Sequence, residues 1–443
     1  MMKRAVFFMA ATIATTQAGA LSAEPVDVET SETDPAVVGW MQGFPPARDK
    51  QVRAAQMEHY TFPKTRWAFS HMRQLLPTVN VWRGKGPIST FPYSLRSDLD
   101  QVTFVPVGSD RRMSWEESLK VNYTDAIIVL HRGDIVYERY FGVTTPQTPH
   151  MSFSMTKSYV GTLAAMLIER GALDERKAVS AYIPALERSG FGDATVRQVL
   201  DMTTGLDYAE VYSDPDSGVF KLVYAAGFLP APKDYQGPDT IYSYLPTVRK
   251  KGEHGERFTY NSVNTDVLGW LLSQATGKRL EQLLSDEIWQ KLGAEMDAYI
   301  VSDPAGTAFA SGGFNATLRD QARFGEMIRQ GGFFNGQQIV PRDVVEALRG
   351  GGDRLAFEKA GWATLPGWSY RDQWWVSHNA NGAFAARGVH GQTIYIDPAA
   401  EMVIVRLASY PTAANANLDP TSLPAYQAIA DHLTKTRLDA SSK

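Results

Sequence analysis

The sequence lacks cysteine, has few histidines and contains no long apolar run. Without cysteine in its 443 residues, the chain has no thiol nucleophile, disulfide or thiolate metal site. The eight histidines are scattered and form no His-Glu-x-x-His pattern, which argues against a zinc hydrolase. No stretch spans a bilayer comfortably. The net charge of −4 gives no reason to expect nucleic acid or an anionic membrane as a partner. We therefore expect no metal and no organic cofactor.

The N-terminus has the pattern of an export signal. Lys3 and Arg4 precede an apolar run and then small residues, which predicts a secretory signal over residues 1–23 that is cleaved after Ala20 or Ala23. An uncleaved anchor is the alternative interpretation. With the signal removed, we expect a secreted or periplasmic protein with no membrane attachment.

A serine and a lysine stand where an apolar helix begins. Ser154 and Lys157 form a Ser-x-x-Lys pair, and apolar residues that recur every three to four positions predict a helix to about Arg170. Ser152 is a plausible N-cap, and Gly171 stands where a helix often ends.

This spacing suits nucleophilic chemistry. The backbone N–H of Ser154 would be one of the unpaired donors of the helix start, so it can point at a developing oxyanion. If Lys157 is buried, it loses its proton readily enough to act as a base. From this motif alone, a capping serine beside a solvated lysine is the alternative.

Strand patterns occur near both ends of the chain. Two apolar runs are predicted strands before Ser154, and three more occur near the end, followed by a helix that Ser422 would cap: 126–130, 135–141, 384–389, 392–396, 402–409 and helix 424–437. The middle is mainly helical. We therefore expect an α/β (α+β) fold, in which an antiparallel sheet is flanked by N- and C-terminal helices and a mainly helical domain is inserted.

The same patterns predict the domain boundaries. They are a signal peptide (1–23), an extended N-terminal arm (24–65), a sheet domain (66–170 and 374–437), an inserted helical and lid domain (171–373) and a C-terminal tail (438–443). Within the insert, residues 206–256 are irregular, which predicts a lid or binding loop. A decorative insertion is the alternative.

Three motifs appear in a specific order. The Ser154 pair is followed by Tyr260-Asn261-Ser262 at the start of another helix, and later by Gly388-Val-His-Gly-Gln392. This order resembles the serine β-lactamase and penicillin-binding-protein superfamily, in the branch that contains class C β-lactamases, family VIII carboxylesterases and 6-aminohexanoate-dimer hydrolases. The resemblance covers about residues 40–437 and is more specific for the fold than for the substrate.

The resemblance implies a serine hydrolase that works through an acyl-enzyme. Ser154 would be the nucleophile, and Lys157 would take or relay its proton. Tyr260 would be the acid/base partner, with its phenol biased toward ionisation by the lysine ammonium. The backbone N–H groups of Ser154 and Val389 would form the oxyanion hole.

Two departures from the β-lactamase pattern affect the expected substrate. The second motif is Tyr-x-Ser rather than Tyr-x-Asn, and the Lys-Thr-Gly of β-lactamases is absent. Arg387 would supply some positive charge in that region, or would face solvent. We therefore expect the partner to be a small linear amide or short-chain ester. A β-lactamase, a D,D-peptidase and a non-catalytic cell-wall binding protein are the alternatives.

Five residues are predicted to contact the substrate. The resemblance implies them, although ordinary packing explains the two aromatic rings equally well, and a structural role explains the histidine better. They are Tyr212, Ser262, Trp375, Gly388 and His390.

Overall fold

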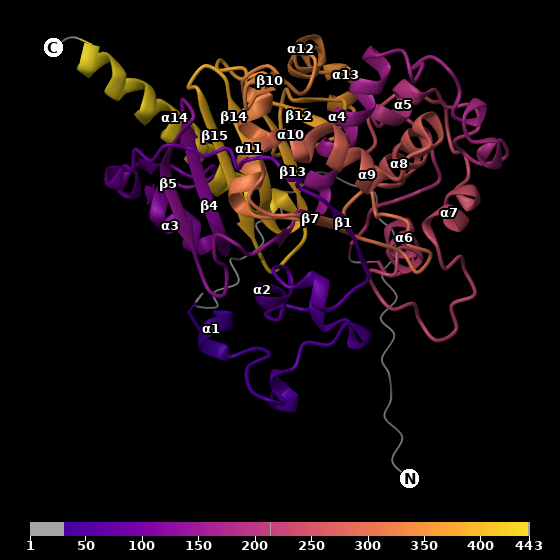
Figure 1. Cartoon of the computed structure of the whole chain (residues 1–443), viewed down its shortest axis with the longest axis horizontal. Helices are drawn as coiled ribbons and strands as arrows, with labels where there is room; N and C mark the ends of the chain where they lie inside the picture. Colours follow the sequence, from indigo (N-terminus) through magenta and orange to yellow (C-terminus); the bar gives the residue numbers. More distant parts are fainter. Residues whose placement is uncertain (1–30, 213, 442–443) are drawn as a thin grey trace.

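The two ends of the chain meet in one antiparallel sheet. The computed structural model describes residues 31–212 and 214–441, so the predicted signal peptide lies outside the described residues. Seven strands form the main sheet, in the order β11-β12-β13-β14-β15-β4-β5 (Figure 1). Their bounds are β4 Thr124–His131, β5 Asp134–Tyr140, β11 Ser369–Arg371, β12 Trp374–Val376, β13 Phe384–Gly388, β14 Gln392–Asp397 and β15 Met402–Ala408. The predicted sheet, built from early and late strands, is confirmed by the pairing of β4 with β15.

Alternate residues of the central strands supply two different hydrophobic cores. On β4, Ile128 and Leu130 face the core shared with α4 (Thr156–Glu169) and α11 (Leu318–Arg329). Ile127 and Val129 face the opposite core, which α3 (Trp115–Val121) and α14 (Asp419–Ser441) cover. Because successive side chains point to opposite faces, a strand buried on both faces reads as a continuous apolar run. The mixed α/β architecture is confirmed.

A second sheet leads the chain into the nucleophile. Its four strands have the order β1-β7-β8-β6 and the bounds β1 Thr78–Val81, β6 His150–Met151, β7 Ala298–Val301 and β8 Phe314–Ala316. The sequence analysis missed this sheet because strands of two to four residues are too short to show a period. β6 ends just before Ser154, so this sheet fixes where the nucleophile helix begins.

The segment between the two sets of sheet strands is mainly helical. Its helices, with the shorter ones elsewhere, are α1 Pro35–Val38, α2 Thr65–Ala68, α5 Val196–Leu200, α6 Gly218–Ala225, α7 Ile241–Tyr244, α8 Val263–Thr276, α9 Leu280–Leu284, α10 Gln290–Leu292, α12 Arg342–Gly350 and α13 Arg354–Glu358. Short strand pairs are β2 Thr103–Phe104 with β3 Met113–Ser114, and β9 Phe333–Phe334 with β10 Gln337–Gln338.

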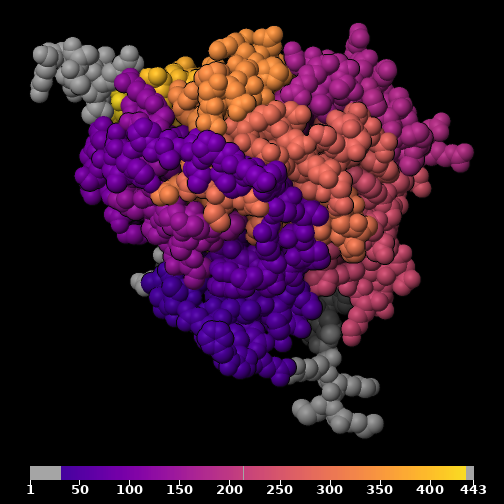
Figure 2. Space-filling model, viewed as in Figure 1, coloured from indigo at the N-terminus to yellow at the C-terminus, as the bar shows by residue number. Residues whose placement is uncertain are grey.

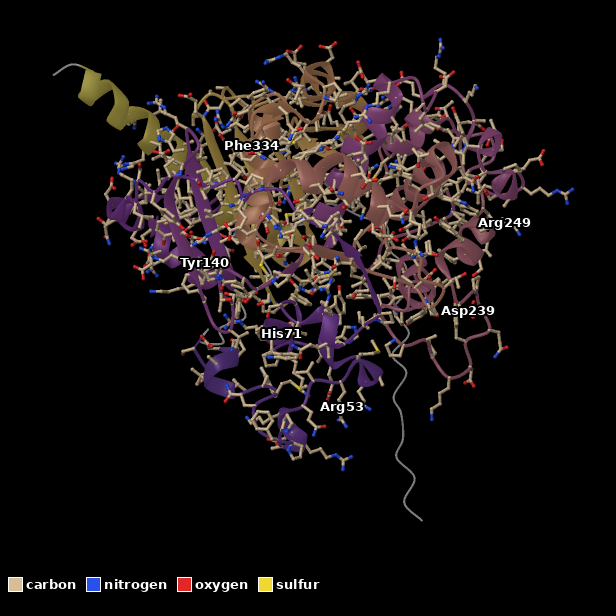
Figure 3. All side chains as sticks on the ribbon, in the orientation of Figure 1. Arg53, His71, Tyr140, Asp239, Arg249 and Phe334 are labelled. Carbon is tan, nitrogen blue, oxygen red and sulfur yellow. The ribbon has the colours of Figure 1, made fainter. Side chains whose placement is uncertain are left out.

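The stretch 206–256 is less irregular than the sequence indicates. It contains α6 and α7, whose buried residues join the main core. Asp239 and Arg249 of this stretch lie at the outer edge of the molecule in Figure 3. The assignment of this tract as a lid stays a prediction, as do the domain boundaries.

Two predicted helix starts are wrong. The Ser152 side chain does not cap α4; it donates a hydrogen bond to Gln321 Oε1 at 3.3 Å, and a 3₁₀ turn precedes the helix. Ser422 lies inside α14, which begins earlier, and its hydroxyl accepts a hydrogen bond from Arg406 at 2.7 Å. α14 also continues past the predicted end, so the described part of the 438–443 tail is helical.

The N-terminal arm packs against the folded domain over its described residues. Val52 is buried with Trp67, and Trp40 packs on the same cluster. In the space-filling view the arm forms the lower part of the molecule (Figure 2). Within the part of the chain that the structure describes, no helix has the length and apolarity that crossing a membrane requires.

Candidate active site

Ser154 sits in a sharp turn between strand β6 and helix α4. The preceding residue, Phe153, has φ of 45°, a left-handed conformation that is uncommon for a residue with a side chain. The 3₁₀ turn Phe153–Met155 then enters α4. Buried residues flank Ser154 on both sides while Ser154 itself is partly exposed. The turn thus presents the hydroxyl at the surface of two cavities.

Lys157 lies beneath Ser154 and is almost completely buried. Its Nζ is 3.0 Å from Ser154 Oγ and donates a hydrogen bond to Ser311 O at 2.6 Å. Burial lowers the pKa of Lys157 to about 8, against the opposing effect of the Glu210 and Asp266 carboxylates. At pH 7, about one molecule in ten therefore carries a neutral amine at this position. The amine has the location and the proton affinity that a base for Ser154 needs.

Tyr260 completes the group, but its ionisation differs from the prediction. Lys157 Nζ lies 5.2 Å from the centre of its ring, and Tyr260 and Ser154 line the same cavity. Burial, reinforced by the Glu210 carboxylate, raises the pKa of Tyr260 well above its usual value near 10. The predicted bias toward ionisation is therefore wrong. The phenol stays protonated at neutral pH, which suits a proton donor.

Two backbone N–H groups at the cavities, those of Ser154 and Val389, are unpaired among the described residues. In the described part of the chain, neither the Ser154 N–H nor the Val389 N–H donates a hydrogen bond to another residue. A Cβ at Gly388 would lie 2.5 Å from Ser152 O and 3.1 Å from Ser154 N. Because only glycine tolerates so close an approach, Gly388 lets the end of β13 lie against the nucleophile turn.

Two cavities open on either side of Ser154 and Val389. The first, of about 60 Å³, is lined mainly by apolar side chains: Tyr60, Met151, Phe153, Tyr212, Val219, Phe220, Leu222, Val223, Phe228, Leu229 and Phe309. The second, of about 460 Å³, mixes aromatic rings with charges, among them Tyr260, Trp362, Trp375, Glu210, Arg257, Arg387 and Asp419.

Three of the five predicted substrate-contact residues line these cavities. Tyr212 lines both, and its hydroxyl donates a hydrogen bond to Glu210 at 3.1 Å. Ser262 lines the first cavity and donates its backbone N–H to Glu210. Trp375 forms a wall of the second, with its ring centre 5.3 Å from that of Tyr260. Their contact with substrate stays a prediction.

The other two residues, Gly388 and His390, line neither cavity. The His390 ring is buried among aromatic rings, including Tyr60 at 5.3 Å, and its Nδ1 contacts Tyr410 O at 2.7 Å. Burial lowers its pKa to about 4, so the ring is neutral. Both residues are buried, and their contact with substrate stays a prediction.

Arg387 is buried rather than facing solvent. It forms an ion pair with Asp419, and its guanidinium lies 5.5 Å from the centre of a Trp375 ring. Because Asp419 already neutralises it, Arg387 does not replace the free lysine charge of a Lys-Thr-Gly motif.

Sequence reasoning missed three residues of this site. Tyr60 reaches the first cavity from the N-terminal arm, and nothing in the local sequence indicates this. Glu210 lies in the irregular tract, where no period marks it. Asp266 gave a signal that was not used: a carboxylate on the apolar face of α8, next to Val267. Within the described residues, no group of three or more His, Cys, Asp or Glu side chains is placed to hold a metal ion.

Comparison with known proteins agrees with this geometry. A family model described as β-lactamase matches residues 122–424. The 6-aminohexanoate-dimer hydrolase of Paenarthrobacter ureafaciens is 38% identical over 350 residues, which cover 79% of this chain and 86% of that protein.

Solved structures show the same architecture. One from Bacillus anthracis, assigned as a 6-aminohexanoate-dimer hydrolase, has a TM-score of 0.79 at 33% identity and covers 88% of this chain and 99% of its own. A family VIII carboxylesterase has a TM-score of 0.52 at 15% identity, with 71% and 96% covered, and shows the fold alone. The chain therefore belongs to the β-lactamase family, and it is a serine hydrolase of that superfamily.

Proposed function

We propose that the protein is an exported hydrolase that cleaves small linear amides or short-chain esters through an acyl-enzyme on Ser154, as the name 6-aminohexanoate-dimer hydrolase indicates for its relative. One observation carries the proposal: a buried lysine amine lies 3.0 Å from the serine hydroxyl, where two cavities meet. A serine with a base in hydrogen-bond reach is the requirement for nucleophilic attack on a carbonyl.

Acylation uses the three side chains in turn. Neutral Lys157 takes the proton from Ser154 Oγ as the oxygen bonds to the substrate carbonyl carbon. The N–H groups of Ser154 and Val389 hold the oxyanion. When the carbon–nitrogen or carbon–oxygen bond breaks, the leaving group takes a proton from the Tyr260 phenol, and the proton held by Lys157 replaces it.

Deacylation reverses these roles. A water molecule attacks the acyl-serine and loses its proton to Lys157, and the oxyanion forms again in the same site. Ser154 leaves with a proton, and the acid product departs. Esters would be cleaved more readily than amides, because an alkoxide is a better leaving group than an amine.

The substrate class rests on what the site lacks. The third position of the tyrosine motif is Ser262 rather than an asparagine, and the only buried cation on β13, Arg387, is already paired with Asp419. Neither a β-lactam side-chain amide nor a substrate carboxylate finds a free partner at these positions. Both absences favour small linear amides and esters over β-lactams and cell-wall peptides.

The test is turnover of p-nitrophenyl acetate and butyrate, and then of linear amides, by the protein without residues 1–23. We expect ester hydrolysis and an acyl adduct on Ser154 by mass spectrometry. Hydrolysis of a cephalosporin at a higher kcat/KM than of any ester would favour a β-lactamase. No turnover and no labelling by a fluorophosphonate would favour a non-catalytic binding protein.

Export is tested separately. Cell fractionation after expression of the full chain would place the protein outside the cytoplasm, with a new N-terminus after Ala20 or Ala23. A cytoplasmic protein of full length would contradict this part of the proposal.

A further inference from the structure

Asp266 is a buried carboxylate next to the catalytic group, and the mechanism above does not use it. It lies on α8 next to Val267 of the core, and it is 1% exposed. Ionised carboxylates are rarely buried unless a partner stabilises them. If Asp266 is ionised in this position, a nearby group must therefore stabilise its charge.

A chain of hydrogen bonds connects this carboxylate with the nucleophile. Asp266 Oδ1 accepts the Ser311 N–H at 3.1 Å. The carbonyl of the same residue, Ser311, accepts a hydrogen bond from Lys157 Nζ at 2.6 Å, and that Nζ is 3.0 Å from Ser154 Oγ. Asp266 is thus hydrogen-bonded to Ser311, whose carbonyl oxygen accepts the hydrogen bond from the Lys157 amine.

The second carboxylate oxygen is not part of this chain. Asp266 Oδ2 has no hydrogen-bond partner among the described residues, and Asp266 lines a cavity of about 290 Å³ that shares no lining residue with the two cavities at Ser154. Ionisable groups around Asp266 come from several elements: Lys157 on α4, Tyr208 and Glu210 on the tract before α6, Tyr242 on α7, and Arg279 and Glu281 at α9.

Among these groups, Lys157 is the cation free to respond to Asp266. Arg279 is paired with Glu281 at 2.6 Å, so its charge is largely neutralised. Burial raises the pKa of Asp266 to about 7, and the Lys157 ammonium opposes that rise. The two groups therefore titrate as a pair in the same pH range.

We propose that Asp266 is a positioning residue of the catalytic centre, which fixes Ser311 so that its carbonyl holds Lys157 and which stabilises the ammonium that forms when Lys157 takes the Ser154 proton. This inference rests on the proposed function, because it assigns a partner to the base of that reaction.

The sign of the effect follows from the charge. A carboxylate near Lys157 favours the ammonium form, so removal of the charge lowers the pKa of Lys157. Lys157 would then be neutral over a wider pH range but would be a weaker base. Asp266→Asn should move the acid limb of the pH profile of kcat/KM to lower pH by about one unit and should lower the plateau of kcat about tenfold or more. KM for esters should change little, because Asp266 lines neither substrate cavity.

The experiment is the pH profile of p-nitrophenyl ester hydrolysis by the wild type, Asp266→Asn and Asp266→Glu. Glutamate keeps the charge, so the acid limb should return toward its wild-type position even where kcat stays low. The matched control is Asp303→Asn. Asp303 is also buried, but it accepts N–H groups of Ile241, Ala305 and Thr307 and contacts neither Ser311 nor Lys157.

The outcomes distinguish a role of Asp266 in the ionisation of Lys157 from a purely structural role. A lower kcat in Asp266→Asn with an unmoved acid limb, or an equal shift in Asp303→Asn, would overturn the proposal and leave a structural role. If Asp266→Asn does not fold, the profile of Asp266→Glu decides: a limb at the wild-type pH supports the proposal and a shifted limb overturns it. If the wild type turns over no ester, the pH dependence of fluorophosphonate labelling at Ser154 gives the same reading. A wild type that neither turns over nor labels would refute the proposed function itself.

Discussion

The two cavities that meet at Ser154 have walls of different chemistry. No charged side chain lines the first, whose walls come from the N-terminal arm, the nucleophile turn and α6. The second is lined by charged side chains of both signs, including Glu210 and Arg257, together with Trp362 and Trp375. One nucleophile thus stands between an apolar space and a polar, aromatic one.

The difference in polarity between the two cavities predicts how a substrate would be oriented. An unpaired charge in the first cavity would lose its hydration without compensation, which is costly, whereas a methylene chain would gain from burial there. The second cavity offers aromatic faces and hydrogen-bond partners. A substrate with one aliphatic side and one polar or aromatic side would bind in a single direction across Ser154.

The largest effect is expected from removal of the Ser154 hydroxyl, which both cavities share. Ser154→Ala should lower kcat/KM for p-nitrophenyl butyrate by about 10³-fold or more, because it removes the hydroxyl that lies 3.0 Å from the Lys157 amine and forms the acyl-enzyme in the proposed reaction. The measurement is steady-state hydrolysis with a mass-spectrometric search for the adduct. Turnover that survives in this variant would mean that the two cavities do not frame the reacting carbonyl.

The pH dependence of the rate should come from Lys157, which is common to both cavities, so it should be the same whichever cavity a substrate occupies. The pKa of Lys157 is lowered to about 8, and the base must be neutral. Log kcat/KM should therefore rise with pH and level off above about 8, and should fall about tenfold per unit below that. The acid limb should lie at the same pH for acetate and butyrate esters. A limb that moves with the substrate would assign it to a cavity group rather than to Lys157.

A change confined to the first cavity should discriminate between acyl chain lengths. Val223 lines it and is only partly buried, at the edge of the main core, so Val223→Phe should reduce the space in the cavity. Each buried methylene contributes about 0.8 kcal/mol, so kcat/KM for butyrate should fall roughly tenfold relative to acetate. Its neighbour Tyr224 lines neither cavity, and Tyr224→Phe should leave the ratio unchanged. An equal loss for both esters would mean that the acyl chain lies elsewhere.

The smallest effect concerns the second cavity. Trp362 is 37% exposed, with its ring centre 5.0 Å from that of Trp375. Trp362→Ala should raise KM for aryl esters about fivefold with kcat nearly unchanged, because an aromatic contact contributes about 1 kcal/mol. Trp82, which is 45% exposed and outside both cavities, provides the matched control, Trp82→Ala. Loss of kcat without a change in KM would contradict this assignment.

Much of the main sheet could be predicted because burial on both faces leaves a local signal. The runs 126–130 and 402–405 are continuous and apolar, and the structure places them in adjacent strands. The second sheet left no such signal, and Ser422 has the chemistry of a cap although its hydroxyl serves Arg406. A motif shows which residue is present but not which partner the fold will bring to it.

The same limit applies to the site. Ser154, Lys157 and Tyr260 could be named from spacing and from a family resemblance, and the structure places them together. The ionisation state of Tyr260 could not be predicted from the sequence, because its pKa depends on burial and on Glu210, which approaches from another part of the chain. Tyr60 reaches the site from the distant N-terminal arm, so no local pattern marks it. Asp266 stands out locally as a carboxylate on an apolar helix face, but its contact with Ser311 joins distant segments and could not be read from the sequence.

The place of Val389 beside Ser154 has a consequence for the timing of biosynthesis. The ribosome makes the nucleophile and its lysine long before it makes the end of β13, and β15, the central neighbour of β4, follows later still. A nascent chain that stops short of these strands has Ser154 and Lys157 but lacks the Val389 N–H, the proposed second oxyanion donor, and the middle of its main sheet. Hydrolytic activity should therefore appear only after β15 has been made.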